Sequence, residues 1–293
     1  MTDSTRGHLA MLAFSALVAG SFSLGSMTAN HIDPAAFNAV RFVFGAVVVG
    51  SLVQARGGFE RWQFRAPWRY LVLGGLFGAY FVLMFEGLKT AAPVSAAAVF
   101  TLTPIMAAGF GYLLLRQVMT GRMALALAIG GAGALWVIFR ADLSALLAFQ
   151  VGRGEVIYFV GCVSHAVYTP MVRALNRGEP APVSTFGTMV GGAVVLFAWG
   201  WPAVVGTDWA ALPMIVWITL FYTAVFATAV TVVLLQFASM RLPAYKVMAY
   251  TYLTPTWVIG WEFLLGNGLP TIYVLGGIAL TCVALLLLLK EEG

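Results

Sequence analysis

Long apolar segments alternate with short polar breaks from one end of the chain to the other. Most segments approach the ~20 residues that an α-helix needs to cross a bilayer, and the gaps between them are too short for a soluble domain. The pattern predicts ten spans, over residues 9–29, 35–54, 68–88, 93–115, 122–140, 155–175, 183–204, 212–236, 243–265 and 270–290. We therefore expect an all-α membrane protein.

The composition favours the same class. Hydrophobic residues make up 61% of the 293 residues and charged residues only 9%, whereas a soluble domain carries about 25% charged residues. No A-x-A-like cleavage site follows a short apolar core, so we expect the first span to be retained. Two cysteines, Cys162 and Cys282, lie in predicted spans and indicate neither a disulfide framework nor a metal site.

The distribution of positive charge predicts the orientation. With a cytoplasmic N-terminus, the cytoplasmic segments hold eleven basic residues: Arg6, Arg56, Arg61, Arg65, Arg69, Arg116, Arg122, Arg173, Arg177, Arg241 and Lys290. The outer segments hold three: Lys89, Arg140 and Arg153. Because basic loops stay inside, both termini are expected to be cytoplasmic. The net charge of +5 then reflects these loops, and we expect no nucleic-acid partner.

A repeated tripeptide indicates two similar halves. Leu-Thr-Pro occurs at residues 102–104 and again at 253–255, in the fourth and ninth spans. The copies are five spans apart, and an odd number means that the second half enters the membrane from the opposite side. Gly-Gly pairs at 130–131 and 276–277 mark the fifth and tenth spans. The pattern predicts an inverted repeat, which many secondary transporters share; chance recurrence in an apolar sequence is the alternative.

The residues around both copies resemble a known family. Residues 88–137 (LKTAAPVSAAAVFTLTPIMAAGFGYLLLRQVMTGRMALALAIGGAGALWV) resemble the second part of an EamA domain, the five-helix repeat of the drug/metabolite transporter superfamily, and residues 238–287 resemble the same region. Pro34 to Arg41 is similar to the family's segment leading to an arginine in the second helix.

The resemblance implies a ten-helix transporter made of two inverted five-helix EamA repeats, residues 8–141 and 154–290, around a central cavity. The family often has Gly-Glu at the end of each fourth helix, where this chain has Leu115-Arg116 and Gly266-Asn267, so no role of that glutamate is carried over. The length and aromatic-rich helices look most like bacterial exporters of aromatic and other amino acids, which implies the inner membrane of a bacterial cell.

The ninth span carries the most suggestive stripe. Lys246, Tyr250, Trp257 and Trp261 share one helical face with Thr254. A cation beside aromatic rings suits a substrate that has a carboxylate and an apolar or aromatic side chain. Two other interpretations stay open: the tryptophans anchor the helix at an interface, or the lysine snorkels to the inner surface.

Three further spans contribute candidate cavity residues. His165 and Tyr168 share a face of the sixth span, and a histidine at this depth needs a cavity or a polar partner. Tyr80 and Met84 share a face of the third span, and Phe100 comes from the fourth. Separately, we expect Arg41 in the second span to cap helix carbonyls or to pair with an acidic group, with contact to the substrate as the less favoured alternative.

The two repeated prolines are candidate gating residues. A proline inside a helix removes one backbone hydrogen bond and clashes with the preceding turn. Pro104 and Pro255 are therefore expected to bend their helices near mid-membrane, where the bend either lets half-helices rock or only shapes the packing.

These features together predict a secondary transporter that exports small metabolites, above all aromatic and other neutral amino acids, by alternating access. A carrier for phosphate esters or nucleotide sugars needs several midplane cations, and only Arg41 and Lys246 qualify; a drug exporter is a further alternative. A membrane-embedded enzyme is remote, since the sequence has no H-E-x-x-H or G-x-S-x-G motif. We expect no cofactor and no bound metal; the partners are the substrate and the lipid bilayer. The flux direction, ion coupling and oligomeric state stay open.

Overall fold

The computed structural model describes residues 3–139, 142–147, 151–239, 241, 242, 247, 249–268 and 272–289, and all regular elements among them are helices. The first half contains α1 (Asp3–Thr28), α2 (Pro34–Ala55), η1 (Arg61–Phe64), α3 (Trp68–Leu88), α4 (Pro93–Phe100), α5 (Thr103–Leu115), α6 (Gly121–Ile138) and α7 (Leu143–Leu147). The second half contains α8 (Arg153–Leu175), α9 (Ala181–Gly206), α10 (Met214–Ala224), η2 (Val225–Val230), α11 (Thr231–Ser239), η3 (Tyr250–Leu253), α13 (Thr254–Leu264) and α14 (Ile272–Leu289).

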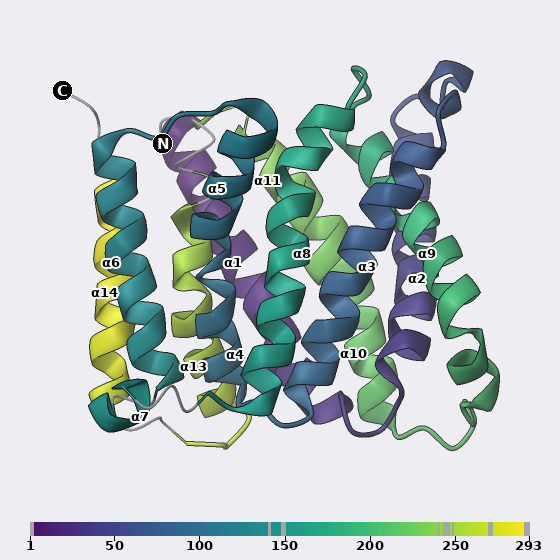
Figure 1. Ribbon diagram of the computed structural model, residues 1–293. Coiled ribbons are helices and arrows are strands. Elements are labelled where there is room, and N and C mark those ends of the chain that lie inside the picture. Colours follow the sequence, from purple (N-terminus) through teal and green to yellow (C-terminus); the bar gives the residue numbers. More distant parts are fainter. Residues whose placement is uncertain are drawn as a thin grey trace.

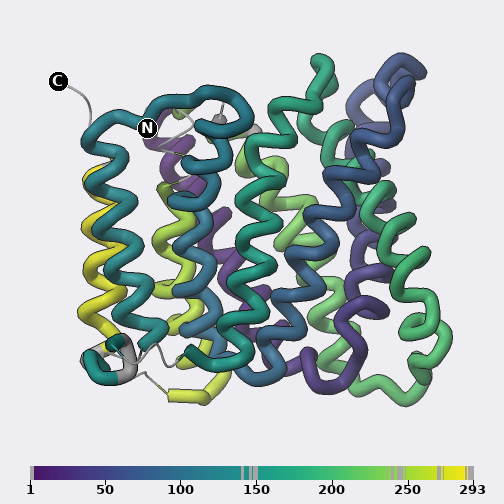
Figure 2. The backbone as a smooth tube through the Cα atoms, in the orientation of Figure 1, coloured from purple at the N-terminus to yellow at the C-terminus, as the bar shows by residue number. Residues whose placement is uncertain are grey.

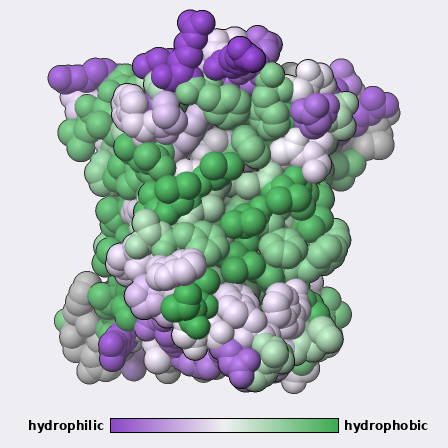
Figure 3. Space-filling model, turned by 90° about the vertical axis from the view of Figure 1, so that its right-hand side faces the viewer, coloured by the Kyte–Doolittle hydropathy of each residue, from purple (hydrophilic) through white to green (hydrophobic). Residues whose placement is uncertain are grey.

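The helices form a bundle with an apolar belt. Within the described residues, eight helices are long and apolar enough to cross a membrane, and a shorter apolar helix covers Val274–Leu287. The face shown in Figure 3 has a hydrophobic band between two hydrophilic rims. Such a belt requires lipid around it, because an exposed apolar surface of this extent is unstable in water. The chain is a multi-pass membrane protein, as the hydropathy pattern predicts.

Most helix bounds follow the predicted spans closely. The third span is helical over Trp68–Leu88, the range expected from its apolar run. The first helix begins earlier than expected, at Asp3, because the polar residues before the span continue the helix out of the membrane. Part of the ninth predicted span, residues 243–246 and 248, lies outside the described residues.

The fourth and ninth spans are interrupted next to each Leu-Thr-Pro copy. Helix α4 ends at Phe100 and α5 begins at Thr103, with Pro104 as its second residue. In the second half, the tight turn η3 precedes α13, whose second residue is Pro255. A proline ring clashes with the carbonyl four residues earlier, and for Pro104 that residue is Phe100, where α4 ends.

A third interruption lies in the eighth span. Between α10 and α11, the residues of η2 form a wide π-type turn. The hydroxyl of Thr228 in this turn donates to the carbonyl of Thr223 five residues earlier, at 2.8 Å. A turn of this width changes the direction of the helix axis, and such turns are frequent at functional sites.

The two halves pack against each other through paired helices. Figures 1 and 2 show α6 beside α14 at one edge of the bundle and α2 beside α9 at the other, and both pairs are in contact. The first residues of α1, the last residues of α14 and the loop that joins α2 to α3 all lie at the same end (Figure 1). That loop holds Arg56, Arg61 and Arg65, the cluster from which a cytoplasmic location of this end is predicted.

Glycines bring the backbones of the halves into contact at three crossings. A Cβ atom on Gly74 of α3 would lie 2.1 Å from the backbone nitrogen of Gly192 on α9. On Gly154 of α8 it would lie 2.4 Å from the carbonyl oxygen of Gly87 at the end of α3, and on Gly277 of α14 it would lie 2.6 Å from the carbonyl oxygen of Gly133 on α6. Real Cβ atoms do not approach so closely, so each crossing requires a residue without a side chain. Small residues are what close packing in membranes uses.

A buried ion pair joins the halves at the end where α3 begins. Arg69 donates to a carboxylate oxygen of Glu179 at 2.7 Å, and their side chains are 3% and 1% exposed. Burial raises the pKa of Glu179, but hydrogen bonds from Arg69 and from the backbone N–H groups of Arg177 and Glu179 itself outweigh it, so the pKa lies below its ordinary value. Arg69 also donates to the carbonyls of Ala66 and Leu175.

Candidate functional site

The centre of the bundle is filled by a cluster of rings from α3, α4 and α8. Tyr80 lies at its middle: its hydroxyl is 3.0 Å from that of Tyr158, and its ring centroid is 4.6 Å from that of His165. Phe100, the last residue of α4, lies 5.8 Å from His165. Tyr80 and Phe100 are buried, while His165 is partly exposed. The structure therefore brings together three of the predicted cavity residues. We call this group the central cluster.

The helical periodicity explains why these rings meet. On α3, Phe77, Tyr80, Phe81 and Met84 recur every three or four residues and so face one side. Met84 is 1% exposed and belongs to the same packed core. Tyr168 extends the cluster along α8, because its ring stacks on Phe77 with centroids 4.7 Å apart.

His165 is the polar residue of the central cluster most suited to contact a substrate. Its Nδ1 atom is buried and has no hydrogen-bond partner within the described residues. A buried imidazole nitrogen without a partner is costly, and a bound molecule would supply the missing hydrogen bond. The ring is otherwise held between Tyr80, Phe100 and Tyr168.

Arg41 differs from its expectation. It was expected to cap helix carbonyls or to pair with an acidic group, but its Nη1 and Nη2 atoms make no hydrogen bond to any described residue. Instead, the guanidinium carbon lies 3.7 Å from the ring centroid of Phe81, which is 4.6 Å from the ring of Tyr80. The sequence could not show this, because Phe81 lies on a different helix, whose rotation brings the ring under the arginine. The charge is therefore at the edge of the central cluster.

The aromatic stripe of the second half packs on α1. Trp257 donates to the hydroxyl of Ser15 at 2.9 Å, and Trp261 donates to the carbonyl of Ala16 at 3.3 Å. The hydroxyl oxygen of Tyr250 lies 2.9 Å from Nδ1 of His8 on α1. The two indole groups, which are partly buried, thus donate their N–H groups to residues of α1.

The stripe and the central cluster share α1 as a common neighbour. Phe22 of α1 contacts the rings of Phe100 and Tyr158, with centroids 5.9 Å apart in both pairs. Trp257 and Trp261 pack against the same hydrophobic core that contains Tyr80. Lys246, the cation expected in this stripe, lies outside the described residues.

Sequence reasoning missed several residues of the central cluster. Phe77 and Phe81 flank Tyr80 at helical spacing, and Tyr158 lies two turns before His165 on the same face of α8. The helical spacing of these rings from Tyr80 and His165 is the signal in the sequence that could have identified them. Glu155 was also missed: it is buried at the start of α8, where it accepts a hydrogen bond from Ser95 of α4 at 2.8 Å. This bond ties α4 to α8 on the side opposite the Arg69–Glu179 pair.

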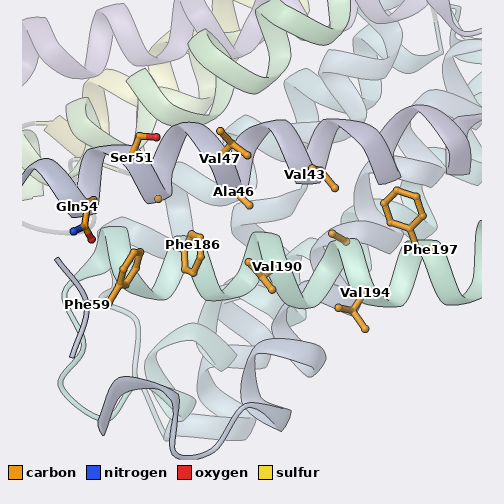
Figure 4. A pocket seen from close by; sticks show the side chains of 12 residues that line it. Val43, Ala46, Val47, Ser51, Gln54, Phe59, Phe186, Val190, Val194 and Phe197 are labelled. Carbon is orange, nitrogen blue, oxygen red and sulfur yellow. The ribbon is translucent and has the colours of Figure 1, made fainter. Parts of the chain in front are cut away.

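An open surface groove lies away from the central cluster. It runs between α2 and α9, has a volume of about 700 Å³, and is lined almost wholly by apolar side chains such as Val47, Phe186 and Val190 (Figure 4). None of the predicted site residues lines it. Because it opens onto the outside of the bundle in the apolar belt, we assign it to contact with lipid tails and not to substrate.

Comparisons with known proteins agree with this architecture. A sequence model of the EamA-like transporter family matches residues 5–139 and again residues 152–290. The chain is 26% identical over 275 residues to the "Uncharacterized transporter YyaM" of Bacillus subtilis (strain 168), covering 92% of this chain and 90% of that protein. A crystal structure of a protein with 20% identity superposes with a TM-score of 0.69 and covers 97% of this chain and 95% of that one. That structure has the same fold.

Proposed function

This chain belongs to the EamA-like transporter family, and from that premise we propose that it exports small metabolites, above all aromatic and other neutral amino acids, from a bacterial cell. The family is one of membrane transporters, and the relative in Bacillus subtilis is also named as a transporter and not as an enzyme. The proposed mechanism is alternating access, in which the site opens to one side of the membrane at a time. We propose that the cytoplasmic end is the one that carries the arginine-rich loop.

The observation that carries this proposal is the central cluster. Aromatic rings from α3, α4 and α8 surround His165, whose Nδ1 atom is buried without a described partner. Ligand sites in proteins combine a mostly apolar lining with a few polar atoms that fix the orientation of the ligand. A neutral amino acid with an aromatic or aliphatic side chain matches this combination, because its side chain is apolar and its amino and carboxylate groups are polar.

The interrupted helices support the alternating-access part of the proposal. The breaks before Pro104 and Pro255 lie in α4–α5 and in η3–α13, and the residues beside them contact the central cluster or α1. A helix that lacks continuous hydrogen bonding bends at lower cost than a continuous one. We propose that the segments on the two sides of each break move separately when the site changes its exposure.

Counterflow in proteoliposomes tests the function. Vesicles containing the purified protein are loaded with unlabelled amino acid, and uptake of the labelled form is measured across a panel of amino acids, with and without a pH gradient. We expect accelerated uptake of phenylalanine, tyrosine and leucine. If nucleotide sugars, phosphate esters or cationic drugs are carried and amino acids are not, the proposed substrate class is wrong. Chemical conversion without transport would instead point to an enzyme.

Two substitutions test the site. His165→Ala removes Nδ1, the unpartnered polar atom of the central cluster, and Trp257→Ala removes a ring that packs against α1. Both are expected to impair counterflow while leaving expression and size-exclusion behaviour near those of the wild type. Trp201→Ala is the matched control, since that ring is 56% exposed on the outside of the bundle. Unchanged transport in both site variants would remove the assignment.

A further inference from the structure

Arg41 carries a buried positive charge whose two terminal nitrogens have no hydrogen-bond partner in the described part of the chain. The residue lies in the middle of α2 and is 2% exposed. Its Nη1 and Nη2 atoms are both buried and have no hydrogen-bond acceptor among the described residues. A guanidinium taken out of water without acceptors is among the most unfavourable arrangements in a protein interior. Contact with the ring of Phe81 at 3.7 Å compensates for only part of that loss, because a ring accepts no fork of hydrogen bonds.

The described acidic residues do not neutralise this charge. The ion pairs found in the described part of the chain join Asp3 to Arg6, Glu86 to Lys89 and Glu179 to Arg69. The carboxylate nearest in sequence, Asp33, caps the first turn of α2 by accepting from two backbone N–H groups. An anion from outside the described chain therefore fits the unused side of the guanidinium.

The position of Arg41 indicates where such an anion would lie. Phe81, under the guanidinium, is in contact with Tyr80 and Phe77, with ring centroids 4.6 and 4.7 Å apart. The ring of Tyr80 in turn lies 4.6 Å from the ring of His165, measured between centroids. The guanidinium and the unpartnered histidine are thus linked through the rings of Phe81 and Tyr80, which puts both groups beside the central cluster.

We propose that Arg41 binds the carboxylate of the transported substrate, and that this requirement makes the protein selective for monocarboxylates with an apolar or aromatic group. The inference rests on the proposed function and names the recognition element of that same site. Guanidinium matches a carboxylate with two parallel charge-assisted hydrogen bonds. A single cation balances one negative charge, so a carboxylate fits better than a phosphate dianion. The rings of the central cluster contact the apolar group, and Nδ1 of His165, when neutral, accepts from the substrate ammonium.

A comparison of two transported probes tests the role of Arg41. The probes are L-phenylalanine and phenethylamine, which has the same ring and amino group but no carboxylate. In counterflow below saturation, Arg41→Gln is expected to lower L-phenylalanine transport on the order of 100-fold, since two charge-assisted hydrogen bonds are lost. We expect transport of phenethylamine to be slow in the wild type and not to fall further in the variant. Arg41→Lys keeps the charge but not the planar fork and is expected to lose an intermediate amount.

Arg173→Gln is the matched control, because it removes an arginine that is exposed on α8; both probes should behave as in the wild type. If Arg41→Gln lowers both probes by the same factor, or leaves L-phenylalanine unchanged, the proposal is overturned. If the variant does not fold, competition in the wild type decides. In that test, L-phenylalanine and its amide compete with labelled L-phenylalanine for transport by the wild type. The amide, which lacks the carboxylate, must inhibit more weakly, and equal inhibition by the two overturns the proposal.

A binding measurement separates this inference from the proposed function. 3-Phenylpropionate has the carboxylate and the ring but no amino group, so its binding does not depend on amino acid transport. It is expected to raise the thermal unfolding midpoint of the wild type and not that of Arg41→Gln. Absence of amino acid counterflow together with this protection would refute the proposed function and support the role of Arg41. Absence of protection by any of these carboxylates would refute the role of Arg41.

Discussion

The ion pair between Arg69 and Glu179 provides a sharp test of how this fold is held together. Replacing Glu179 with alanine leaves a guanidinium that is 3% exposed without its carboxylate. Removing one partner of a buried pair costs about 3–5 kcal/mol. Arg69 keeps two backbone acceptors, the carbonyls of Ala66 and Leu175, so we expect the lower end of that range. A chain of this size would then lose roughly 6–10 °C in its thermal midpoint.

The chain carries its own reporter for this measurement. Cys162 is buried at the centre of α8, and the other free thiol, Cys282, is only partly buried. In a Cys282→Ala background, a thiol-reactive dye labels Cys162 only when the bundle opens, so fluorescence against temperature gives the midpoint in detergent. Glu86→Ala is the control, because the Glu86–Lys89 pair is 39% and 29% exposed and is worth less than about 1 kcal/mol. Equal midpoints for the two variants would refute the reasoning.

The same pair predicts a pH dependence with a definite sign. Because the pKa of Glu179 lies below its ordinary value of 4.5 in the folded protein, its carboxylate stabilises the fold at any pH above that ordinary value. The contribution is lost as pH falls below 4.5 and through the lowered pKa. The difference in midpoint between the wild type and Glu179→Gln should therefore be constant from pH 8 to pH 6 and shrink below pH 4.5. A difference that grows with acidity would contradict the assignment.

Two further predictions concern packing inside the bundle. Gly74→Ala should lower the thermal midpoint by several degrees, because the added Cβ would lie 2.1 Å from the backbone nitrogen of Gly192. Gly75→Ala is the control and should leave the midpoint unchanged, because its Cβ would have its nearest atom at 3.9 Å. Equal effects of the two variants would show that the backbones do not touch there. Trp257→Phe and Ser15→Ala each remove the hydrogen bond of 2.9 Å between α13 and α1. Each should therefore lower the free energy of unfolding by about 1 kcal/mol. Measured by chemical unfolding, the double variant should lose less than the sum of the two single losses.

The sequence predicts the helices well because the bilayer constrains them. A span must contain about 20 apolar residues and satisfy its own backbone hydrogen bonds, so the run from Trp68 to Leu88 is specified almost to the residue. The position of the break before Pro104 follows from local sterics in the same way, since the clash falls on Phe100. Both features depend on residues that are close in the sequence.

The site is predictable only in part, because it depends on how helices rotate against one another. Periodicity placed Tyr80 with Met84 and His165 with Tyr168, each pair on one face, but it could not show that the two faces meet. For the same reason, periodicity could not predict the contact between the guanidinium of Arg41 and the ring of Phe81. The stripe from Tyr250 to Trp261 was recognised as a face, yet its hydrogen bonds to α1 depend on a contact between residues about 240 positions apart.

The three glycine crossings have a mechanical consequence. Each of them joins a helix of the first half to a helix of the second at backbone distance, so pulling the halves apart there would lose the close packing that holds helices together in a membrane. The interrupted segments, α4–α5, α10–α11 and η3–α13, come from both halves as well. If these segments move as proposed, we therefore expect the moving parts and the fixed parts each to contain helices of both repeats, so that the division between them does not follow the boundary between the repeats.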